Sequence, residues 1–168
     1  MPRIAMLGRF QPVHLVHEDS IKKAQQYGDV CVGIYCAPRS SYNPFTPDEV
    51  ERMLNNALSG IETFRFIPTL NPRRFRNQLT YGAGTEIVYT TSRRTAILMS
   101  ALNLDAIYER RKELSASEIR KMVAKGDETW KSLVHEANIG IISGVELPGH
   151  PNFFRRRMVK SLYKHGFM

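Results

Sequence analysis

The chain has 168 residues, of which 42% are hydrophobic and 24% charged. This composition excludes a disordered or fibrous protein and fits one soluble globular domain over residues 1–168. No run approaches the roughly twenty apolar residues of a membrane helix, and a strand pattern begins at Ile4, so we expect neither a membrane partner nor a signal peptide. The formal net charge of +8 favours anionic ligands, among them ATP, mononucleotides and nucleic acid. Cys31 and Cys36 point to opposite faces of one strand and should not pair, so we expect a reduced, cytoplasmic protein.

The first predicted unit is a strand, a glycine turn and a helix. The apolar run Ile4–Leu7 predicts a buried strand, and residues 18–26 predict a helix. A turn at Gly8 between them suits phosphate, because free N–H groups and the positive end of the helix dipole both face the ligand. His14 and His17 share one face of a first helical turn, from which their imidazoles can donate hydrogen bonds to phosphate oxygens. The pair also suits a metal site, for which we find no third ligand nearby, or an ordinary helix surface.

A second strand and a capped helix follow. Residues 29–36 are almost continuously apolar, which is typical of a parallel strand buried on both faces. The loop at 38–44 lies at the carboxyl end of that strand, where open α/β sheets place their ligands. A helix is predicted from Thr46 to about Ser59, because Thr46 and Glu49 form a capping box around a proline in the first turn.

The middle of the chain is less regular. Residues 64–68 predict a third strand that a proline ends, and residues 71–81 predict a short helix. This helix would present Arg76 and Tyr81 to a substrate, because basic residues interleaved with aromatic ones suit nucleotides. A plain surface helix explains the pattern equally well.

Two more strands and two helices complete the pattern. Strands are predicted at 86–90 and 105–108, with a helix at 93–102 between them, and a basic amphipathic helix at about 152–165. The C-terminal helix would cover the core or form a subunit contact. Because strands and helices alternate, we predict an α/β fold with a Rossmann-like, doubly wound parallel sheet of about five strands and helices on both faces.

A further helix at 115–125 offers a second phosphate-binding start. Ser115 and Glu118 form a capping box, Ser115 and Ser117 offer hydroxyl groups, and Arg120 lies one turn further along. A capped surface helix would show the same residues.

Three motifs in order along the chain carry a resemblance to a known family. Residues 8–17, GRFQPVHLVH, resemble the G-R-F-Q-P-x-H-x-G-H opening of the nucleotidyltransferase superfamily. Residues 44–49, PFTPDE, resemble its P-F-T-x-x-E helix start, and residues 114–120, LSASEIR, resemble its I-S-x-[ST]-x-[IV]-R signature. The chain is most similar to the archaeal-type nicotinamide mononucleotide (NMN) adenylyltransferases. It differs at Val16, where the family has glycine, and at residues 90–92, where many relatives carry S-G-N.

The resemblance implies a Rossmann-like adenylyltransferase that transfers AMP from ATP to the 5′-phosphate of NMN and releases pyrophosphate. It implies catalytic roles for His17, His14 and Arg120, and Mg²⁺ carried by the ATP phosphates rather than by a protein metal site. It implies ATP or phosphate binding by Gly8, Arg9, Phe10, Gln11, Ser115, Ser117 and Arg120, and acceptor binding by Arg9, Tyr81 and Arg76.

Two alternatives share these motifs. One is another nucleotidyltransferase, with a different phosphate acceptor or with CTP; the other is a non-catalytic homologue that binds a nucleotide or nucleic acid. Val16 and the basic charge favour the second alternative. In the main interpretation the partners are ATP and a mononucleotide, nucleic acid is not expected, and the protein is a homo-oligomer.

Overall fold

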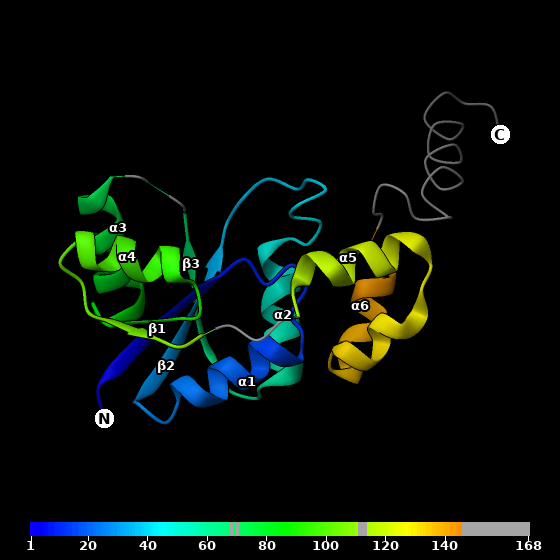
Figure 1. Cartoon of the computed structure of the whole chain (residues 1–168), viewed down its shortest axis with the longest axis horizontal. Helices are drawn as coiled ribbons and strands as arrows, with labels where there is room; N and C mark the ends of the chain where they lie inside the picture. Colours follow the sequence, from blue (N-terminus) through cyan, green and yellow to red (C-terminus); the bar gives the residue numbers. More distant parts are fainter. Residues whose placement is uncertain (68, 70, 111–113, 146–168) are drawn as a thin grey trace.

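A five-stranded sheet with all strands parallel forms the centre of the protein (Figure 1). The computed structural model describes residues 1–67, 69, 71–110 and 114–145. Strand order is β3-β2-β1-β4-β5, and the register places Ile4 beside Val30 and Ala5 beside Val88. The strands are β1 Arg3–Gly8, β2 Asp29–Tyr35, β3 Glu62–Phe66, β4 Val88–Thr90 and β5 Ala106–Tyr108.

Helices cover both faces of the sheet, and the predicted Rossmann-like α/β fold is confirmed. They are α1 Leu15–Ala24, α2 Pro47–Ala57, α3 Pro72–Gln78, α4 Arg93–Ala101, α5 Ala116–Lys125 and α6 Ile139–Ser143. Shorter turns are a π-helical turn at Leu79–Ala83 and 3₁₀ turns at Glu128–Leu133 and Glu136–Asn138. Within the described part of the chain, no helix has the length and apolar character needed to cross a membrane.

Alternation along the strands produces two separate cores, because successive side chains of a strand point to opposite faces. On one face Ile4 and Met6 of β1 pack with α1, α2 and α5, and Trp130 joins them from the first 3₁₀ turn. On the other face Ala5 packs with α3, α4 and the π-helical turn, and Cys31 of β2 lies on that face with its thiol free.

The predicted elements are present with small shifts at their ends. The first helix begins at Leu15 rather than residue 18, the third strand lies two residues earlier than 64–68, and β4 is shorter than 86–90. Residues 126–145, for which the sequence indicated no element, form the two 3₁₀ turns and the short helix α6. Among them Asn138 is buried and donates from Nδ2 to the Met53 carbonyl of α2 at 3.0 Å. The helix predicted at about 152–165 lies outside the described residues, so the extent of the single domain stays a prediction.

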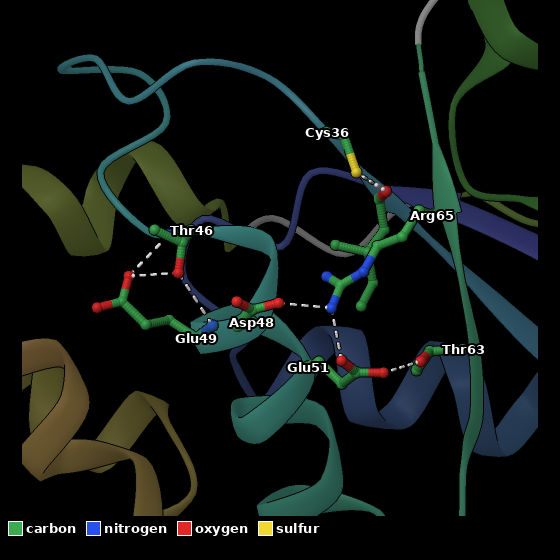
Figure 2. Close-up of polar contacts among 8 residues, drawn as sticks. Cys36, Thr46, Asp48, Glu49, Glu51, Thr63 and Arg65 are labelled. Atoms are coloured by element: carbon green, nitrogen blue, oxygen red, sulfur yellow. Dashed lines mark hydrogen bonds and ion pairs between the residues drawn. The ribbon is translucent and has the colours of Figure 1, made fainter.

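The start of α2 is fixed to its surroundings by polar contacts (Figure 2). The predicted capping box is present: the Glu49 N–H donates to Thr46 Oγ1, and the Thr46 N–H donates to the Glu49 carboxylate at 2.7 Å. In the same part of α2, Asp48 and Glu51 accept from Arg65 of β3 at 2.7 and 2.6 Å. These contacts hold α2, and the loop that leads into it, against the edge of the sheet.

Candidate active site

A cleft lies at the centre of the sheet, where the strand order changes direction between β1 and β4. β1 and β4 are neighbours at the centre, but β1 continues to β2 on one side and β4 to β5 on the other. Open α/β sheets bind ligands in the crevice beyond the carboxyl ends of such strands. A cavity of about 370 Å³ occupies this position, and it is lined by the end of β1, the end of β4 and the first turns of α1, α4 and α5.

The floor of the cleft is the turn after β1, and its shape depends on Phe10. Phe10 has a φ of +50°, a left-handed conformation that is uncommon for a large side chain. Its ring folds back over Gly8, where a Cβ atom would lie only 2.6 Å from the ring. Gly8 is therefore needed for space. The same ring meets the imidazole of His17 edge-on, with centroids 4.9 Å apart, and so fixes the orientation of His17.

The two histidines stand together at the start of α1, so the prediction that they share one face is confirmed. His14 caps the helix through its backbone, since its carbonyl accepts from the His17 N–H at 2.8 Å. The two imidazoles stack with centroids 3.7 Å apart and an angle of 25° between their planes. Both residues line the cleft. Of the side chains described, no group of three His, Cys, Asp or Glu residues is placed to hold a metal ion.

A second wall comes from the start of α5. Ser115 caps the helix as predicted, with Glu118 completing the box, and its hydroxyl lies 2.9 Å from that of Ser117. Arg120 donates from Nη1 to the Gln11 carbonyl at 2.5 Å, which ties α5 to the turn after β1. Burial, together with the nearby positive charge of Arg9, lowers the pKa of Arg120. Two guanidinium groups held close in one cleft produce a strong attraction for anions.

A third wall consists of hydroxyl-bearing residues that the sequence analysis did not assign to the site. Thr90 ends β4 and Thr91 follows it, and Ser92 caps α4 by accepting from the Thr95 N–H at 3.3 Å. The sequence offered two clues: these residues end a strand and begin a helix, and they stand where many relatives carry S-G-N. Their presence in the cleft depends on β4 lying beside β1, which local patterns do not reveal.

Beneath this wall a polar network supports β4. The Tyr89 hydroxyl donates to Glu109, and Lys23 of α1 pairs with the same carboxylate. Burial and the hydrogen bond to Glu109 raise the pKa of Tyr89, while hydrogen bonds from Lys23 and Tyr89 lower the pKa of Glu109. Tyr89 therefore remains a neutral phenol that connects the cleft to α1.

Two of the predicted acceptor-binding residues lie elsewhere. Arg76 donates from Nη2 to the carbonyls of Leu102 and Asn103, at 2.8 and 3.2 Å, at the end of α4. Tyr81 is 85% exposed, and neither residue lines the cleft. This geometry gives no support to an acceptor-binding role for Arg76 or Tyr81, because the Arg76 guanidinium is bonded to carbonyls outside the cleft and the π-helical turn leaves Tyr81 at the surface. Arg9, by contrast, does line the cleft.

Strand order and cleft position define a Rossmann-like α/β protein with a cationic site suited to nucleotide phosphates. No family model matches the chain. A nicotinamide-nucleotide adenylyltransferase of Methanolobus tindarius is 32% identical over 159 residues, which cover 87% of this chain and 90% of the relative. Enzymes of the same name from Methanococcus vannielii and Pyrobaculum aerophilum are 31% and 28% identical, with 86% of this chain and 90% and 89% of the relatives covered. The chain belongs to the nicotinamide-nucleotide adenylyltransferase family, and is thus a nucleotidyltransferase, as the three motifs indicated.

Proposed function

We propose that this protein transfers AMP from ATP to the 5′-phosphate of NMN, giving NAD⁺ and pyrophosphate. The observation that carries the proposal is the convergence of the turn after β1, the first turns of α1 and α5, and the side chains of Arg9 and Arg120 on one cleft. Both helix starts direct backbone N–H groups and partial positive charge toward that space. The relatives carry this activity in their names.

The cleft separates naturally into two phosphate subsites. At the start of α5, Ser115, Ser117 and Arg120 would hold the β- and γ-phosphates of ATP, which leave as pyrophosphate. In the turn after β1, the backbone amides from Gly8 to Phe10 and the Arg9 guanidinium would hold the attacking phosphate. His14 and His17 stand beside these groups, and His17 would donate to the α-phosphate that is transferred.

The reaction requires positioning of the two substrates and stabilisation of the developing charge, and it does not require a general base. An oxygen of the acceptor phosphate, already an anion, forms a bond to the α-phosphorus while the bond from that phosphorus to the bridging oxygen of pyrophosphate breaks. Negative charge grows on the oxygens around the phosphorus, and fixed donors aimed at those oxygens lower the barrier. The ring contacts of His17 with His14 and Phe10 supply that fixed orientation.

We propose that Mg²⁺ arrives on the triphosphate. No Asp or Glu is found among the described residues that line the cleft, which offer guanidinium, imidazole, hydroxyl and amide groups. Mg²⁺ prefers oxygen ligands, keeps several waters and is often bound mainly through substrate phosphates. When bound it would neutralise charge on the departing pyrophosphate.

A turnover assay tests the proposal. Purified protein with ATP, Mg²⁺ and NMN should release pyrophosphate and form NAD⁺, which a dehydrogenase-coupled assay detects by absorbance. Other mononucleotides and phosphate acceptors, and CTP in place of ATP, serve as comparisons. A faster reaction with another acceptor or with CTP would identify a different nucleotidyltransferase, whereas nucleotide binding without pyrophosphate release would identify a non-catalytic homologue.

We also propose that the protein is a homo-oligomer in the cytoplasm. Apolar side chains are exposed on α4, at Ile97 and Leu98, and Tyr108 is exposed on the edge strand β5. A face of this kind suits association with a second copy. Sedimentation equilibrium of the wild type and of Ile97→Lys would test it, because a monomeric wild type contradicts the proposal.

A further inference from the structure

Gln11 belongs to the first sequence motif and lines the cleft, and its side-chain amide is bonded to the backbone of Phe45. The Phe45 N–H donates to Gln11 Oε1 at 2.9 Å, and Gln11 Nε2 donates to the Phe45 carbonyl at 3.0 Å. Gln11 is 4% exposed and Phe45 is 2% exposed. The Gln11 side chain thus forms a two-point clip on the backbone of the loop that enters α2, and its role in phosphate binding stays a prediction.

The backbone of Gln11 also makes a contact with Arg120. Its carbonyl accepts the hydrogen bond from Arg120, a residue 109 positions later in the chain. Arg120 needs such a partner because Arg9 stands nearby with the same charge, and the two guanidinium groups repel each other before an anion arrives. A carbonyl oxygen with partial negative charge is the contact that keeps Arg120 directed into the cleft.

We propose that Gln11 is the positioning residue for Arg120: the amide clip on Phe45 fixes the Gln11 backbone, and the fixed carbonyl aims the guanidinium at the departing pyrophosphate. Phe45 is itself held, because it packs in the core and the next residue, Thr46, is locked by the capping box shown in Figure 2. The order of contacts is therefore α2, Phe45, Gln11, Arg120. The inference rests on the proposed function for its catalytic consequence, but the contacts stand without it.

The chain contains a matched control. Gln78 makes the same two-point clip on Ile67, since the Ile67 N–H donates to Gln78 Oε1 at 2.7 Å and Gln78 Nε2 donates to the Ile67 carbonyl at 2.8 Å. This clip joins α3 to the end of β3 and does not line the cleft. Replacing either glutamine by methionine removes two hydrogen bonds and keeps the length of the side chain.

The experiment is a double-mutant cycle. Gln11→Met should lower kcat by on the order of tenfold to a hundredfold, as for a catalytic group displaced by about 1 Å, whereas Gln78→Met should leave it within about twofold. In an Arg120→Ala background, Gln11→Met should change kcat by no more than about twofold, because the residue through which it acts is gone. An equal loss in both backgrounds, or a folded Gln11→Met with wild-type kcat, would overturn the proposal.

A second measurement separates this inference from the proposed function. Phenylglyoxal modification of Arg120, followed by peptide mass spectrometry, should be several-fold faster in Gln11→Met than in the wild type and unchanged in Gln78→Met. If the wild type does not adenylate NMN, the proposed function fails, but the rate of Arg120 modification in Gln11→Met relative to the wild type still decides the role of Gln11. Should Gln11→Met not fold, Gln11→Glu keeps the acceptor for the Phe45 N–H and replaces the donor by a carboxylate oxygen, which adds a negative charge beside the Phe45 carbonyl. Loss of folding in both, with Gln78→Met intact, would assign Gln11 to stability alone.

Discussion

Replacement of His17 by alanine is the sharpest test of the catalytic assignment. The imidazole is positioned by two rings, His14 stacked at 3.7 Å and Phe10 edge-on at 4.9 Å, on the first turn of α1. Loss of one preorganised donor to a developing oxyanion lowers kcat by 10²- to 10³-fold, about 2.7–4 kcal/mol. We therefore expect His17→Ala to lose kcat by this factor while the KM for ATP changes much less.

The same geometry predicts a separate cost in stability. Each ring contact contributes roughly 0.5–1.5 kcal/mol, so the alanine variant should lose about 1–3 kcal/mol of unfolding free energy. Pyrophosphate release should therefore be assayed well below the Tm, with circular dichroism showing that both proteins are folded. His135→Ala is the matched control, because His135 caps a 3₁₀ turn through Nδ1, away from the cleft. A folded His17→Ala with wild-type kcat would refute the role given to this residue.

Three further predictions concern the cleft wall, the departure from the family pattern and the start of α2. Arg120→Lys should raise the KM for ATP and lower kcat, because a bidentate fork becomes a point charge; steady-state kinetics matching the wild type would count against the second phosphate site. Val16 lines the cleft, and Val16→Gly should change the KM for ATP only modestly, because the surroundings are already adapted to valine; glycine also costs up to about 1 kcal/mol of helix stability there. A nearly inactive wild type rescued by this substitution would show instead that valine impairs the ATP site. Partial burial acts to raise the pKa of Glu49, but hydrogen bonds from the Thr46 N–H and from Arg39 outweigh burial, and the pKa is lowered. The ionised carboxylate therefore stabilises the folded protein above the unfolded pKa of about 4.3, and this stabilisation disappears as the pH falls through the lower folded value. Urea unfolding should show Glu49→Gln less stable than the wild type at pH 7 by about 1 kcal/mol or less, and equal to it near pH 2; a difference independent of pH would contradict the assignment.

Local patterns in the sequence were sufficient for most of the sheet and for the two helix starts that we propose bind phosphate. The apolar runs at β1 and β2 and the capping boxes at Thr46 and Ser115 depend on residues within a few positions of one another. The elements at residues 126–145 were missed because 3₁₀ turns and a five-residue helix have too few residues to show a period.

Pairings between distant residues were beyond such patterns. Gln11 was predicted to bind phosphate because it stands in a binding motif, and its bonds to Phe45 and from Arg120 are visible only in the structure. Arg76 was predicted to bind a substrate because it lies among basic and aromatic residues, whereas in the structure its guanidinium donates hydrogen bonds to carbonyls at the end of α4. In both cases the side chain serves a backbone group that the fold brings near, and composition does not distinguish that use from ligand binding.

The central place of β1 has a consequence for the order of events during synthesis. β1, β2 and β3 are made from the first 66 residues and lie side by side, so they can pair while the rest of the chain is still on the ribosome. One edge of β1 then stays open until Val88 emerges to pair with Ala5, and an open strand edge can recruit another chain. Slow translation between β3 and β4 would thus prolong the period in which nascent chains can aggregate, and chaperones that shield strand edges should matter most at that length.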